Sequence, residues 1–122
     1  MNQTKSAQMT PTAATRTSAR IRHTVVFRLK HPVGSAAQQS FLQAAMQLAR
    51  SEGVERFECL RQISTKNSFT FGLSMEFADE AAYGRYSANP DHERFVRERW
   101  LPEVAEFMEI DYTVLEMPTP GK

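Results

Sequence analysis

The stretch SFTFGLSMEF, residues 68–77, decides how this sequence folds. Every second residue from Phe69 to Phe77 is apolar, whereas the residues between them are small or polar. Alternation with a period of two indicates a β-strand that buries one of its faces. The segment from Ile21 to Leu29 alternates in the same way, so the sequence predicts a sheet with one apolar face.

The same patterns predict four strands and two helical regions. A helix is expected from Ser35, as its N-cap, to about Ser51, and two helical pieces follow the caps Asp79 and Asn89. Strands are expected at 21–29, 54–63, 68–77 and 108–114. The order β-α-β-β-α-β is that of the split βαβ, ferredoxin-like α+β fold, in which helices cover one face of an antiparallel sheet.

The other face of this sheet is expected to be partly apolar. In the fourth strand, Met108, Ile110, Tyr112 and Val114 alternate with Glu109, Asp111 and Thr113. We expect Val26, Leu60, Leu115 and Met117 to point away from the helices. A sheet with a partly apolar bare face usually needs a cover, and the simplest cover is a second copy related by a twofold axis. The sequence therefore predicts a homodimer.

Length and composition limit the class of protein. The 122 residues are enough for one domain, which we place at residues 21–117, with a disordered tail at 1–20 and a short tail at 118–122. The formal charge of +1 gives no reason to expect a nucleic-acid partner, and no apolar run is long enough to span a membrane. We expect a cytoplasmic protein, although the acid-free first 20 residues weakly resemble an organelle transit peptide.

Three side chains are candidates for chemistry. His92 falls near the third position of a helix, where the helix dipole disfavours protonation, so a neutral imidazole there could act as a general base. Tyr86 lies six residues earlier and could donate to a developing oxyanion. His23 falls on the apolar face of the first strand. Each also has a plainer interpretation, as a packed or hydrogen-bonded core residue.

Other polar residues give no recognised site. The three histidines, 23, 31 and 92, match no metal-ligand spacing, and no phosphate loop or nucleotide motif occurs, so no metal or cofactor is expected. Cys59 is interpreted as a buried packing group. The acids of the last third are interpreted as a solvated face: Glu98, Glu103, Glu106 and Glu109.

Three segments resemble the stress-responsive A/B barrel (Dabb) family. They are IRHTVVFRLK at 21–30, YSANPDHERFV at 86–96 and IDY at 110–112, and the resemblance covers about residues 21–116. It implies a ferredoxin-like homodimer whose two sheets form a barrel, with no established activity in most members. Asn89 departs from the family pattern, which usually has histidine before the proline.

One branch of the family, the plant olivetolic acid cyclases, closes a linear polyketide by an aldol condensation. The resemblance implies that its catalytic tyrosine and histidine fall on Tyr86 and His92, and a further pocket histidine on His23. Two polar pocket positions of the cyclases fall on Ala45 and Phe71, which makes the pocket of this chain more apolar. The pocket-lining residues expected on this basis are His23, Phe41, Ala45 and Phe71.

Three functions follow from these expectations. The first is a homodimeric stress-response protein whose small apolar pocket binds a hydrophobic or aromatic small molecule, without established catalysis. The second is a lyase or cyclase acting on polyketide-like carbonyl compounds, with His92 as base and Tyr86 as donor. The third, from fold analogy alone, is a cofactor-free monooxygenase of the antibiotic-biosynthesis type.

Overall fold

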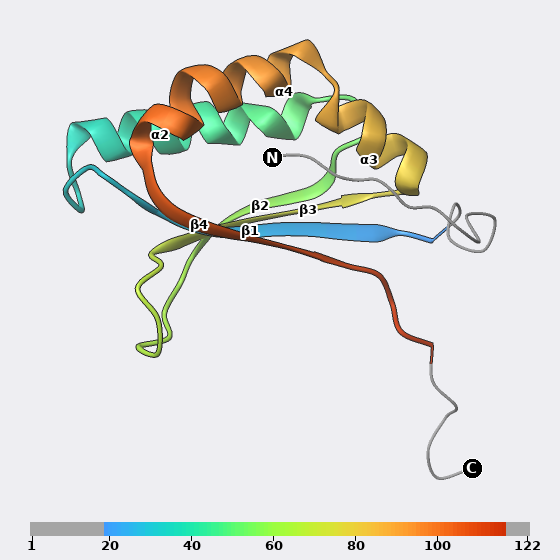
Figure 1. Cartoon of the computed structure of the whole chain (residues 1–122), viewed down its shortest axis with the longest axis horizontal. Helices are drawn as coiled ribbons and strands as arrows, with labels where there is room; N and C mark the ends of the chain where they lie inside the picture. The colour runs from blue at the N-terminus through green and yellow to red at the C-terminus, as the bar shows by residue number, and fades with distance from the viewer. Residues whose placement is uncertain (1–18, 117–122) are drawn as a thin grey trace, which may run out of the picture.

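The computed structural model describes residues 19–116. The predictions for most of the first tail, for Met117 and for residues 118–122 lie outside the described residues. Four strands, four α-helices and two irregular helical segments follow one another along the described chain (Figure 1). In order they are β1 (Ile21–Leu29), α2 (Ala36–Met46), the 3-10 helix η1 (Gln47–Arg50), β2 (Glu55–Arg61), β3 (Phe71–Phe77), α3 (Glu80–Ser87), α4 (Pro90–Phe95), the π-helix η2 (Val96–Trp100), α5 (Leu101–Glu103) and β4 (Val104–Tyr112).

The four strands form one sheet in the order β2-β3-β1-β4, and every neighbouring pair is antiparallel. The helices lie together on one face of this sheet, and the other face of the described sheet carries no helix (Figure 1). This arrangement confirms the predicted ferredoxin-like α+β fold. The two central strands, β1 and β3, are the two that alternate most clearly in the sequence.

The helix starts lie where the sequence predicts them. The side chains of Ser35, Asp79 and Asn89 each accept a hydrogen bond from a backbone N–H two or three residues further on. Such a bond satisfies one of the N–H groups that a helix leaves unpaired at its first turn. The caps at Asp79 and Asn89 fix the short turn between α3 and α4, and this turn sets the position of the candidate residues Tyr86 and His92.

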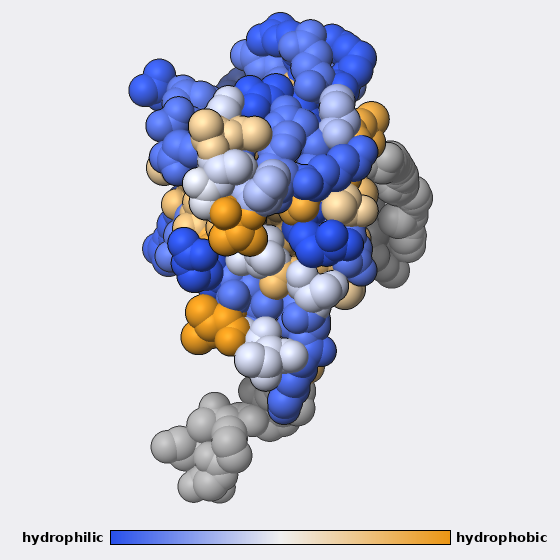
Figure 2. All heavy atoms as spheres, turned by 90° about the vertical axis from the view of Figure 1, so that its left-hand side faces the viewer, coloured by the Kyte–Doolittle hydropathy of each residue, from blue (hydrophilic) through white to orange (hydrophobic). Residues whose placement is uncertain are grey.

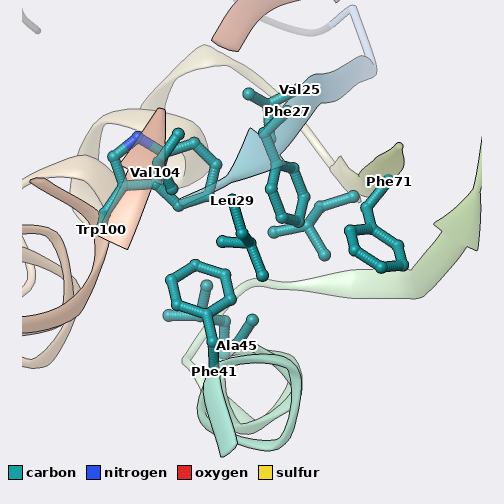
Figure 3. Packing of buried hydrophobic residues seen from close by; sticks show 10 residues of the cluster. Val25, Phe27, Leu29, Phe41, Ala45, Phe71, Trp100 and Val104 are labelled. Carbon is teal, nitrogen blue, oxygen red and sulfur yellow. The ribbon is translucent and has the colours of Figure 1, made fainter. Parts of the chain in front are cut away.

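The centre of the core is an aromatic cluster between the sheet and the helices (Figure 3). Phe27 of β1 is fully buried, and its ring lies 5.0 Å from Trp100, 5.7 Å from Phe71 and 5.8 Å from Phe41, measured between ring centroids. Tilted aromatic pairs at these distances stabilise the core beyond the area they bury. The cluster packs α2 and η2 against the sheet near the C-terminal end of β1.

Strand β4 differs from its prediction in both extent and orientation. It begins at Val104 instead of residue 108 and ends at Tyr112, so Leu115 lies beyond the strand. Val25 pairs with Glu109 and Val26 with Met108. Directly paired residues of neighbouring strands share a face of the sheet. Because Val25 faces the helices, Glu109 does so too, and Met108 lies on the open face.

Both strands of the β2–β3 hairpin are also shorter than predicted. Ladder pairing in β2 covers 55–61 and in β3 covers 71–77, and a β-bulge interrupts the register between Glu55 and Glu58, where Arg56 has a φ of 51°. Arg20, which we expected in the disordered first tail, contacts the sheet instead. Its guanidinium donates to the carboxylates of Glu55 and Glu76.

The two faces of the molecule differ in character. In the end-on view of Figure 2, hydrophilic residues dominate the helix layer at the top of the picture. On the open face of the sheet, Leu60, Met108, Ile110 and Tyr112 are each between 39% and 52% exposed.

Within residues 19–116, no helix combines the length and the apolar character needed to cross a bilayer.

Candidate functional site

A small cavity of about 30 Å³ lies between the sheet and the helices. Five side chains that carry a polar group contribute to its lining: His23 of β1, Tyr86 of α3, His92 of α4, Trp100 of η2 and Glu109 of β4. Among the lining residues in the described part of the chain, only Glu109 is exposed, so the cavity reaches the surface at the β4 edge. A space of this size holds a water molecule or two.

The remaining walls of the cavity are apolar and come from both layers. The side chains are Val25, Leu73 and Met75 of the sheet and Leu48, Phe95 and Val96 of the helices. Leu48 and Phe95 also line a wider surface groove of about 510 Å³ between η1 and α4. These two side chains therefore stand between the cavity and the groove. Displacement of these two side chains would join the two spaces.

His23 is held in a defined orientation by two partners. Its Nδ1 lies 2.6 Å from Oδ1 of Asp111 and 3.0 Å from the hydroxyl of Tyr83, and this hydroxyl donates to Oδ2 of Asp111 over 2.8 Å. A carboxylate can only accept, so the imidazole donates from Nδ1. In the neutral ring, Nε2 then remains an acceptor. A carboxylate that fixes a histidine in this way is the arrangement that positions acid–base histidines in many enzymes.

His92 lies against Tyr86 at the start of α4. The two ring centroids are 4.5 Å apart. Burial lowers the pKa of His92, the backbone of Ser87 opposes this shift, and the nearby His23 adds to it. Nδ1 of His92 is buried and has no hydrogen-bond partner among the described residues. An unpaired buried nitrogen is costly, and a ligand in the cavity could satisfy it.

Tyr86 is the link between the two histidines. It is 2% exposed, and its ring centroid lies 6.5 Å from that of His23 and 4.5 Å from that of His92. Burial raises the pKa of the Tyr86 hydroxyl, and the charge of Glu109 raises it further. Burial also raises the pKa of Tyr83, with added contributions from Asp111 and then Glu109. Both hydroxyls therefore remain hydrogen-bond donors at neutral pH.

The structure brings together three of the six residues expected at the site. His23, Tyr86 and His92 line one cavity, whereas Phe41, Ala45 and Phe71 belong to the packed core and do not line it. The reason is position along each element. Phe71 lies two residues before Leu73, so it packs on Phe27 at the far end of the core.

The sequence analysis assigned no site role to Glu109 or Asp111, although Asp111 belongs to the IDY segment of the family resemblance. Glu109 is exposed, as expected of a solvated face, but it also lines the cavity, and Asp111 holds His23. The available signal is the alternation of β4, which we interpreted with the opposite face inward. Glu103, from the same group of acids, instead accepts from His31 and Arg99, and these bonds lower its pKa against the opposing effect of burial.

The histidines and acids of this region do not gather into a metal-binding group. Within residues 19–116, no cluster of three or more histidine, cysteine, aspartate or glutamate side chains is arranged to hold a metal ion. The chemistry that the described residues themselves offer is proton transfer and hydrogen bonding, from two imidazoles and a phenol in a mainly apolar space.

Solved structures of similar fold come from bacteria and plants. A Dabb family protein with a ferredoxin-like fold from Mesorhizobium loti is 56% identical, with a TM-score of 0.80 over 80% of this chain and 99% of that one. A hydroxynitrile lyase from Passiflora edulis has a TM-score of 0.72 at 15% identity, covering 84% of this chain and 99% of its own. A dimeric ferredoxin-like protein of unknown function from Thermobifida fusca has a TM-score of 0.67 at 17% identity, covering 81% of this chain and 94% of its own.

The sequence comparisons agree with the structural ones. A stress-response A/B barrel domain-containing protein of Arabidopsis thaliana is 29% identical over 80% of this chain, and the matched region spans 38% of the length of that relative. The family model of the stress responsive A/B barrel domain matches residues 21–114. The cavity described above therefore lies inside the matched domain, and the chain belongs to the stress-responsive A/B barrel (Dabb) family.

Proposed function

We propose that the cavity binds a small, mainly apolar molecule carrying a hydroxyl or carbonyl group, and that His92 moves a proton of that molecule. The observation that carries this proposal is that His92, whose buried Nδ1 has no hydrogen-bond partner among the described residues, lines one cavity with His23 and Tyr86. The apolar walls would hold the body of the ligand, and the few polar groups would orient its reacting end.

The protonation states favour acid–base chemistry of a lyase type. Burial keeps His92 neutral near pH 7 by lowering its pKa, so its Nδ1 can accept a proton. Tyr86 keeps its proton and can donate to a carbonyl oxygen. His23, positioned by Asp111, supplies a second imidazole in the same cavity. His92 can deprotonate one atom of a ligand, and the resulting imidazolium can return the proton to another.

The reaction class that fits is reversible cleavage of a hydroxyl-bearing carbon–carbon bond. When His92 removes the hydroxyl proton, the O–H electron pair forms a C=O bond, and the carbon–carbon bond breaks with its pair on the leaving carbon. The leaving anion then takes this proton from the imidazolium of His92, so protons and charge balance. A hydroxynitrile lyase shares this fold at 15% identity, so the fold accommodates chemistry of this class.

A turnover experiment tests the proposal against binding alone. Mandelonitrile, offered to the purified protein, should be cleaved to benzaldehyde and hydrogen cyanide, with benzaldehyde followed by its absorbance. His92→Gln should lower kcat/KM by about 100-fold or more, because a general base contributes about that factor. His31→Gln is the matched control, since His31 pairs with Glu103 away from the cavity and should retain full activity.

Two outcomes would contradict the proposal. If mandelonitrile binds but is not cleaved by the wild type, the cavity is a binding site without proton transfer. If His31→Gln and His92→Gln lose activity equally while both remain folded, the cavity is not where the reaction occurs. A circular dichroism melt of each variant separates loss of the site from loss of the fold.

The depressed pKa of His92 also predicts a pH dependence of stability. The unfolded chain binds a proton at His92 near pH 6.5, whereas the folded chain resists it. The free energy of unfolding should therefore be unaffected by His92 above pH 6.5, and should fall as the pH drops from 6.5 towards the folded pKa, by at most about 1.4 kcal/mol per pH unit. Urea unfolding at pH 7.5 and 5.5 should show a smaller loss for His92→Gln than for the wild type. An equal loss would contradict a neutral, buried His92.

We also propose that the open face of the sheet is covered by a second copy of the chain. Leu60, Met108, Ile110 and Tyr112 are exposed on this face, and a patch of this kind on a small domain usually marks an interface. The Thermobifida fusca protein of the same fold is described as dimeric. The site and the proposed interface lie on opposite faces of the sheet, so each can be tested separately.

Sedimentation of the purified protein at micromolar concentration should give about twice the 13.9 kDa of one chain. Ile110→Glu should shift the particle towards one chain, because it places a charge in the proposed interface. Val33→Glu is the control, since Val33 is 76% exposed in the loop after β1 and lies off this face. A wild-type particle of one chain would contradict the dimer, as would an Ile110→Glu protein that remains folded and dimeric.

A further inference from the structure

The charges around the cavity are all negative at the β4 side. Glu109 lines the cavity, and Asp111, two residues further along the same strand, holds His23 and Tyr83 from behind. Among the described lining residues there is no lysine or arginine. Inside the cavity, a ligand carboxylate would therefore meet a like charge and no lysine or arginine, since the nearby Arg50, Arg94 and Arg99 line the groove beyond Leu48 and Phe95.

Glu109 has the position of an entrance residue. It is the exposed member of the lining set, on an edge strand, whereas the residues deeper in the cavity are buried or half-buried. Its register opposite Val25 directs it to the helix side of the sheet. A molecule that enters from the β4 edge passes this carboxylate before it reaches the imidazoles.

The effect of Glu109 reaches into the cavity. Its charge adds to the effect of burial in raising the pKa of both Tyr83 and Tyr86. Burial, with this added charge, keeps the hydroxyl of Tyr86 as a donor, and burial keeps His92 neutral, so these two side chains offer a neutral donor and a neutral acceptor. This set complements an uncharged hydroxyl or carbonyl group and does not complement an anion.

We infer that Glu109 is a specificity-determining residue, which admits uncharged hydroxyl or carbonyl compounds to the cavity and excludes carboxylic acids of the same size. The inference rests on the proposed function, because it assigns a substrate class to the same cavity. The inference distinguishes this cavity from a site that binds acidic ligands. It also gives a role to the carboxylate of Glu109, which takes no part in the proton transfer.

Benzyl alcohol and benzoate are a matched pair of test compounds, because they share a ring and differ mainly in charge at pH 7.5. Titration calorimetry should show that the wild type binds benzyl alcohol at least tenfold more tightly than benzoate. Glu109→Gln should reduce this ratio to about threefold or less, through tighter binding of benzoate, and Glu109→Lys should reverse it. The control is Glu52→Gln, which removes the same charge from an exposed turn and should leave the ratio unchanged.

The outcomes separate this inference from the proposed function. Equal binding of the two compounds by the wild type overturns the inference and leaves the proposed function standing. An unchanged ratio in Glu109→Gln, with the variant folded by circular dichroism, overturns it in the same way. Failure of the wild type to bind either compound overturns both, since the cavity then does not accept a ligand of this class.

Discussion

The register of β4 against β1 is the constraint on which both faces of the sheet depend. Because Glu109 lies opposite Val25 and Asp111 opposite His23, these two acids of β4 face the helices. Met108 and Ile110, which alternate with them, must then face the open side. A shift of one residue would exchange the two sets, remove the partner of His23 and bury the apolar patch. One pairing therefore produces both the candidate site and the proposed interface.

Much of the fold could be predicted from the sequence because its central strands and helix caps have local signals. Residues 21–29 alternate cleanly, and the caps at Ser35, Asp79 and Asn89 are residue types that satisfy a helix start. The face of β4 could not be predicted in this way. Met108 and Ile110 lie outside because they pair with Val26 and Thr24 of β1, and the alternation within β4 does not reveal this pairing.

The residues of the candidate site could also be predicted only in part. His23, Tyr86 and His92 are rare polar or aromatic residues at family-like positions, so sequence comparison could point to them. Asp111 and Glu109 become site residues only through pairing between β4 and β1, which lie at opposite ends of the described chain. Whether an apolar residue such as Phe71 lines the cavity or fills the core depends on its place along β3. The alternation of a strand predicts which face of the sheet a residue occupies, but it does not predict which residues along that face meet the cavity.

The tautomer of His23 tests the central claim most directly, because the site depends on the bond that Asp111 accepts. Long-range ¹H–¹⁵N correlation of the imidazoles at pH 8.5, where free histidine is neutral, distinguishes the two tautomers. We expect His23 to carry its proton on Nδ1 in the wild type, and we expect Asp111→Asn to weaken this preference. A wild-type His23 protonated on Nε2 would contradict the claim, because the acceptor nitrogen would then lie on the side of Asp111.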